Sequence, residues 1–171
     1  MKKDFSKNGG YTLVEMIIYV SILSFISVIV VTMLLSFAGS YRNVSALRLA
    51  ENSALYGMER MTRDIMFATS VDTGNSTLGT SPGVLTIVST MGGVSTTTRF
   101  YVDNGILKVD INGTYLGPLT SLGSTVTNLV FRRLSSGVSE AVKSDLTIRG
   151  TSGNVSKDKT YHNTIILRGS Q

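Results

Sequence analysis

The sequence predicts an α+β protein, in which one long N-terminal helix packs on an antiparallel β-sheet domain. Three observations predict it: an uncharged apolar run over residues 16–38, a helix-period pattern that follows it, and short β-forming segments separated by Gly and Asn after residue 70. A helix against a sheet is one of the few layered arrangements that bury an apolar face of each. The 171 residues suffice for an anchor and one modest domain.

Residues 1–10, MKKDFSKNGG, are basic and polar and are expected to form a short leader. Lys2, Lys3 and Lys7 stand before the apolar run. By the positive-inside rule, this charge places the N-terminus in the cytoplasm and the chain after about Gly39 outside. The sequence therefore predicts a single-pass protein of the cytoplasmic (inner) membrane.

Residues 11–38 are predicted to be a transmembrane helix. Their single charge is Glu15, and neither Pro nor Gly interrupts them. About 20 apolar residues in a helix span a hydrocarbon core of roughly 30 Å, whereas the apolar core of a secretory signal peptide has about 7–15. Ser36-Phe37-Ala38 does resemble a signal-peptidase site, so release after Ala38 and an unprocessed anchor are alternatives.

Residues 39–69 are predicted to continue the helix as an amphipathic segment that covers a core. Apolar residues recur at spacings of three, four or seven residues and form a stripe along one face of the helix, and the charged residues lie mostly outside this stripe. Its members are Leu47, Ala54, Met58, Met61 and Ile65. Gly39 and Gly57 each cost about 1 kcal/mol in a helix and are potential bends.

Residues 70–171 are predicted to form a β-rich extracytoplasmic domain. Residues 71–83 and the polar stretch 150–159 have the composition of loops. Asn104-Gly105 and Asn112-Gly113 are strong hairpin-turn signals. Strands are expected at residues 84–89, 98–102, 106–111, 114–116, 125–134, 141–149 and 160–168.

Glu15 is a candidate functional residue because a charge at membrane depth costs about 2.5–3.5 kcal/mol even on insertion scales. A position near the cytoplasmic interface, partly solvated, would explain it without a function. Cleavage after Gly10 would instead create an α-amino group on Tyr11, one helical turn from the Glu15 carboxylate. That carboxylate could pair with its own amine or with the amine of a neighbouring helix, and pairing between subunits would favour one axial register.

The segment Gly10-Tyr11-Thr12-Leu13-Val14-Glu15-Met16 resembles the prepilin processing site of type IV pilins and type II secretion pseudopilins. The resemblance implies cleavage after Gly10 by a prepilin peptidase, methylation of Tyr11, and an assembly role for Glu15. It implies as partners the other pilin or pseudopilin subunits, an inner-membrane assembly platform and, before assembly, membrane lipid. Two departures are Tyr11, where the family usually has Phe, and Thr32, where major pilins often carry proline.

Residues 52–69 and 119–134 are similar to the corresponding parts of minor pilins and J-type minor pseudopilins. This similarity implies a subunit at the fibre tip that helps to initiate assembly. The chain has no cysteine, so it lacks the disulfide of several major pilins. The sequence leaves open whether the system serves a pilus, secretion or DNA uptake.

Other chemistry receives little support. No thiolate site is possible, His162 is the only histidine, and neither a P-loop nor a GxSxG elbow occurs, so we expect no enzyme and no cofactor. His162 lies in an alternating segment and is expected to be an exposed strand residue. Asp103 and Asp110 lie in turns that could offer oxygens to calcium, but plain turns are the simpler interpretation. The basic residues are scattered, so nucleic-acid binding is not expected.

A rival function needs neither cleavage nor a role for Glu15. In it, the chain is a single-pass membrane-anchored extracytoplasmic binding protein that does not polymerise. The mature N-terminus distinguishes the two hypotheses.

Overall fold

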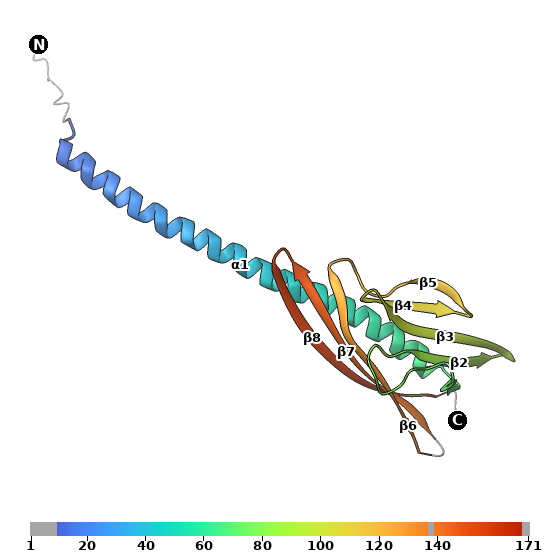
Figure 1. The fold of residues 1–171 in the computed structure, drawn as a ribbon. Helices are drawn as coiled ribbons and strands as arrows, with labels where there is room; N and C mark the ends of the chain where they lie inside the picture. Colours follow the sequence, from blue (N-terminus) through green and yellow to red (C-terminus); the bar gives the residue numbers. More distant parts are fainter. Residues whose placement is uncertain (1–9, 137–138, 169–171) are drawn as a thin grey trace, which may run out of the picture. The chain divides into compact units, whose positions relative to one another are not determined.

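The computed structural model describes residues 10–136 and 139–168 and contains one helix and eight strands in these ranges (Figure 1). The elements are α1 (Leu13–Met66), β1 (Ser70–Val71), β2 (Leu85–Met91), β3 (Val94–Asp103), β4 (Ile106–Ile111), β5 (Thr114–Pro118), β6 (Ser124–Ser135), β7 (Glu140–Ser152) and β8 (Val155–Ile166). The chain divides into two compact units, Met1–Tyr41 and Arg42–Gln171. The α+β class and the long N-terminal helix are thus as predicted.

Helix α1 is helical without interruption through both glycines that we treated as potential bends. Gly57 has a packing role instead. A Cβ built on Gly57 would lie 3.0 Å from Cδ2 of Leu107 on β4, so the glycine allows a close approach of helix and sheet. The helix ends at Met66, three residues before the predicted end, and Ala68 N–H donates to the Ile65 carbonyl in its final turn.

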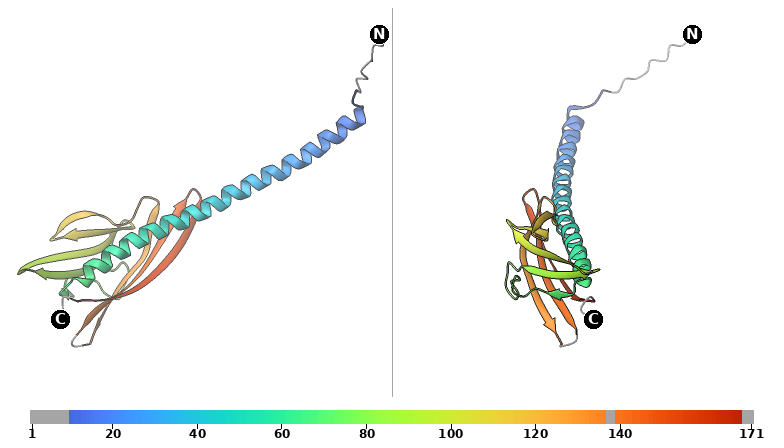
Figure 2. Two further views of the ribbon diagram at one scale, coloured as in Figure 1. Left: turned by 180° about the vertical axis from the view of Figure 1, so that it is seen from behind. Right: turned by 90° about the vertical axis from the view of Figure 1, so that its right-hand side faces the viewer.

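The strands form two antiparallel sheets, where we had expected one. Their orders are β1-β2-β3-β4-β5 and β6-β7-β8. The two sheets are joined by isolated backbone hydrogen bonds: Val126 N–H donates to Gly105 O (2.7 Å), and Gly83 N–H donates to Leu129 O (2.7 Å). Figure 2 shows that the Arg42–Met66 part of α1 lies across one face of both sheets.

The two predicted Asn-Gly hairpin turns are confirmed. Asn104 and Gly105 have φ of 51° and 74°, and Asn112 and Gly113 have φ of 50° and 75°. Positive φ at both central residues is the signature of the type I′ turn, whose twist matches that of paired strands.

The prediction of a loop at residues 150–159 is wrong. Strands β7 and β8 continue through it and pair up to Ser152 and Val155, with only Gly153-Asn154 as the turn. Gly153 has φ of 61°, as the first position of a two-residue hairpin turn requires. The polar composition reflects the exposure of this hairpin end rather than a lack of strand structure.

The segment of residues 71–83 is mostly loop, as predicted, and begins in the short strand β1. Ser70 and Val71 pair with Val88 and Ile87 of β2. The Asp72 carboxylate then accepts hydrogen bonds from the backbone N–H groups of Gly74 and Asn75, at 3.0 and 3.2 Å, which closes a tight turn.

The packed face of α1 is made largely of small residues. Its buried members are Ala46, Ala50, Ser53, Ala54, Gly57, Met61 and Ile65. Of the predicted stripe, Ala54, Met61 and Ile65 are buried and Met58 packs against the core, but Leu47 is 39% exposed. Small side chains on this face let β7 approach the helix backbone. This close approach was not predicted from the sequence, where the expected stripe consisted mostly of larger residues.

The core of the Arg42–Gln171 unit draws on α1 and on both sheets. Its largest fully buried side chains include Met61 of α1, Phe100 of β3 and Phe131 of β6. Several polar side chains are buried beside it, and among them the Ser53 hydroxyl is hydrogen-bonded to the hydroxyls of Ser121 (2.7 Å) and Ser124 (2.8 Å). These bonds satisfy a buried hydroxyl that would otherwise destabilise the fold.

Candidate functional site in the first turn of α1

The predicted site residues lie at the start of α1, which begins immediately after a capping threonine. Glu15 N–H donates to Thr12 Oγ1 (3.3 Å), and Met16 N–H donates to the Thr12 carbonyl oxygen (3.2 Å). Thr12 is therefore the N-cap, and Glu15 occupies the first turn, where a carboxylate interacts favourably with the helix dipole. Gly10 and Tyr11 precede the helix and are exposed.

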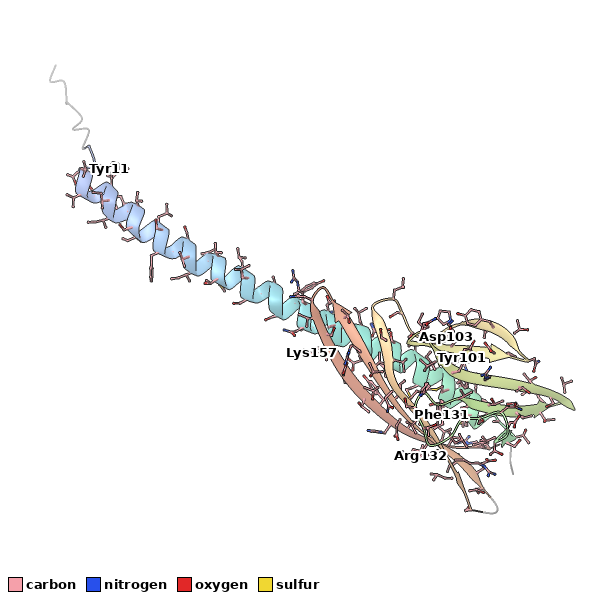
Figure 3. The ribbon with its side chains drawn as sticks, viewed as in Figure 1. Tyr11, Tyr101, Asp103, Phe131, Arg132 and Lys157 are labelled. Carbon is pink, nitrogen blue, oxygen red and sulfur yellow. The ribbon has the colours of Figure 1, made fainter. Side chains whose placement is uncertain are left out.

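Glu15 is hydrogen-bonded to one member of a tyrosine pair. The Tyr19 hydroxyl donates to Glu15 Oε1 (2.9 Å). The rings of Tyr11 and Tyr19 meet edge to face, with centroids 6.3 Å apart and planes at 79°. Glu15 is the one residue among residues 10–38 that is partly buried, while all its neighbours there are exposed (Figure 3 labels Tyr11).

The apolar run that follows the site keeps its few hydroxyls bonded within the helix. Each hydroxyl donates to a backbone carbonyl one turn earlier, at 2.8–3.0 Å. These residues are Ser21, Ser24, Ser27, Thr32 and Ser36. Internal satisfaction of this kind is what a segment in lipid requires.

Helix α1 is long and apolar enough to cross a membrane, judged by length and composition. None of the apolar window is buried within the protein, which separates it from the core helix of a globular domain. Such a large exposed apolar surface is rare on soluble monomers.

The structure places Gly10 and Tyr11 immediately before α1 and Glu15 in its first turn. The remainder of the predicted leader, residues 1–9, lies outside the described residues. Sequence reasoning missed Thr12 and Tyr19. Two signals could have found them: Thr12-x-x-Glu15 is a capping-box pattern, and Glu15 and Tyr19 are four residues apart, on one face of a helix.

A second polar cluster lies on the β6-β7-β8 sheet. Asp145 of β7 is hydrogen-bonded to His162 Nδ1 (2.7 Å) and to Arg132 Nη1 (2.6 Å), and Figure 3 labels Arg132 on β6. The bond with His162 holds the pKa of Asp145 below its usual value, and the charges of Lys143 and Arg132 add to this against the effect of burial. The His162 side chain is 64% exposed, as predicted. These contacts are cross-strand pairs that stabilise a sheet.

The two acidic turns considered for calcium have partners within the protein. Asp103 forms an ion pair with Lys108 (2.6 Å), and Asp110 accepts a hydrogen bond from the Tyr101 hydroxyl (3.0 Å). Over residues 10–136 and 139–168, no group of three or more His, Cys, Asp or Glu side chains is placed to hold a metal ion. Both acids thus have partners within their own hairpins.

Comparisons of the chain with protein-family models, with curated proteins and with solved structures find no match. Function is therefore inferred from the first turn of α1 and from the exposed apolar part of the helix that follows it.

Proposed function

We propose that this chain is a structural subunit of a type IV pilus or a type II secretion pseudopilus. The observation that carries the proposal is Glu15: the one charged residue in the apolar part of α1, residues 13–38, one turn beyond Gly10-Tyr11. A soluble domain rarely exposes so large an apolar surface, and a charge within a membrane-spanning helix is costly and is usually functional.

The proposed mechanism is non-covalent after processing. A prepilin peptidase cuts between Gly10 and Tyr11 and methylates the new N-terminus. Removal of the leader permits extraction of the helix from the membrane, and the apolar helices then pack together in a fibre. In that apolar environment an unpaired carboxylate is costly, so Glu15 pairs with the Tyr11 amine of a neighbour and sets the axial register.

The remainder of the chain takes the role of an outward-facing domain. Under this proposal the second half of α1 is an amphipathic helix that covers the β-rich domain. The domain contacts neighbouring subunits or cargo. Similarity of residues 52–69 and 119–134 to minor subunits favours a position at the tip, where the subunit initiates assembly.

The proposed location is the cytoplasmic (inner) membrane, with the N-terminus in the cytoplasm, and afterwards the fibre. The proposed partners are the prepilin peptidase, other pilin or pseudopilin subunits, the assembly platform and membrane lipid. The rival, a membrane-anchored binding protein that does not polymerise, shares the anchor but needs no processing.

The mature N-terminus tests the proposal. Intact mass and N-terminal peptide mass spectrometry of the chain from native cells should give a start at Tyr11, heavier by one methyl group. A start at Met1 would favour the simple anchor, and a start at Gly39 would indicate a released domain. Either of these would overturn the fibre-subunit proposal.

A further inference from the structure

The tyrosine pair around Glu15 has no part in the mechanism above. A carboxylate in the first helical turn is commonly found turned back toward the N-cap, as in a capping box. Here Glu15 Oε1 accepts from Tyr19, one turn further into the apolar run. The carboxylate is thereby directed along the helix, away from the site of cleavage.

We propose that Tyr19 is a positioning residue that holds the Glu15 carboxylate within the embedded part of α1. The inference rests on the proposed membrane role of this helix. The Tyr19 hydroxyl donates to Oε1, and the Tyr19 ring is in turn packed edge to face with the Tyr11 ring. Within the described residues Oε2 has no bonded donor, so it is available to a donor on a second copy of the chain.

The physical basis is the cost of a poorly solvated carboxylate. A hydrogen bond to an ionised acceptor is shorter and stronger than one between neutral groups, and it gains weight where water is excluded. The two side chains are four residues apart on one helical face, so the bond needs no tertiary structure and can form in a single embedded chain. Tyr19 thus makes the charge tolerable before any partner subunit arrives.

The test uses NMR of the full chain reconstituted in phospholipid nanodiscs. It observes the hydrogen bond from the Tyr19 side and from the Glu15 side. The chain has seven tyrosines, so labelling with ¹³Cζ-tyrosine gives a spectrum simple enough to assign, with Tyr19 identified by the signal lost in Tyr19→Phe. Glu15→Leu should shift the Tyr19 signal, and Glu51→Leu, whose acid lies on the Arg42–Met66 part of α1, should not. Conversely, in a chain labelled with ¹³Cδ-glutamate, Tyr19→Phe should shift the Glu15 signal.

Tyr11→Phe is the matched control, because the Tyr11 ring touches Tyr19 but its hydroxyl makes no bond to Glu15. It should leave the Glu15 signal nearly in place. A Tyr19 signal that is unmoved by Glu15→Leu, or equal shifts of Glu15 in the two tyrosine variants, would overturn the proposal. Both spectra require only that the chain is embedded in lipid. They can therefore confirm the role of Tyr19 even if the mature N-terminus shows that the fibre-subunit proposal is wrong. A chain that does not enter the nanodiscs would overturn the inference itself.

Discussion

Gly150 of β7 lies directly against Ala46 of α1. A Cβ built on Gly150 would lie 2.0 Å from the Ala46 carbonyl oxygen and 2.8 Å from the Ala50 backbone nitrogen. Strand and helix backbones therefore meet with no room for a side chain. This contact fixes where the three-stranded sheet sits on the helix within the Arg42–Gln171 unit.

Gly150→Ala should destabilise the protein by about 3 kcal/mol or more, because the added methyl meets backbone atoms, which move only by displacing the helix. Gly117→Ala is the control, since a Cβ there has open space around it. Urea unfolding of the full chain in detergent, followed by circular dichroism, would measure both. Similar midpoints for the two variants would contradict the close contact.

Phe131→Ala should lower the free energy of unfolding by about 3–5 kcal/mol, because the Phe131 ring is fully buried in the core between α1 and the sheets. Phe67→Ala removes a ring that is 59% exposed and should change stability by no more than about 0.5 kcal/mol. The same unfolding measurement checks both. Equal losses of unfolding free energy in the two variants would contradict the placement of Phe131 of β6 in the core.

Glu15→Ala should leave membrane insertion intact and abolish entry into fibres, because removing the charge favours insertion but removes the proposed register contact. Glu59→Ala, which alters an exposed acid further along α1, should assemble normally. Fractionation of native cells, with immunodetection of membrane and sheared-fibre fractions, gives both readings. Normal incorporation of the Glu15 variant would defeat the register argument.

The Asp145 cluster should make stability depend on pH in the acid range. The pKa of Asp145 is lowered in the folded state, so its contribution is present above the unfolded value of about 3.9 and is lost as pH falls toward the folded value. His162 and Arg132 are more than half exposed, so the contribution should be no more than about 1 kcal/mol.

Asp145→Asn removes this titration. Unfolding at pH 6 should be easier for the variant than for the unaltered chain, and the difference should shrink at pH 3. A difference that is the same at both pH values would show that the pairing with His162 and Arg132 adds no stability.

Much of the candidate site was within reach of the sequence because its contacts are local. Gly10, Tyr11 and Glu15 are close in the chain, and a helix brings residues four apart together without tertiary help. Tyr19 is four residues from Glu15, and Thr12 caps the backbone N–H of Glu15 three residues later. Both roles could therefore have been predicted from the sequence. Two of the turns were equally local, since Asn-Gly at residues 104–105 and 112–113 specifies its own backbone conformation.

The sequence by itself determined the class of the fold, the apolar helix and most of the strands, because periodicity and turn residues act over short distances. Only the tertiary structure decided the division into two sheets, the extension of β7 and β8 through a polar stretch, and the small-residue face of α1. Those features depend on which surfaces meet. Gly150 and Ala46 are far apart in the chain, and only their contact explains why one has no side chain and the other a small one.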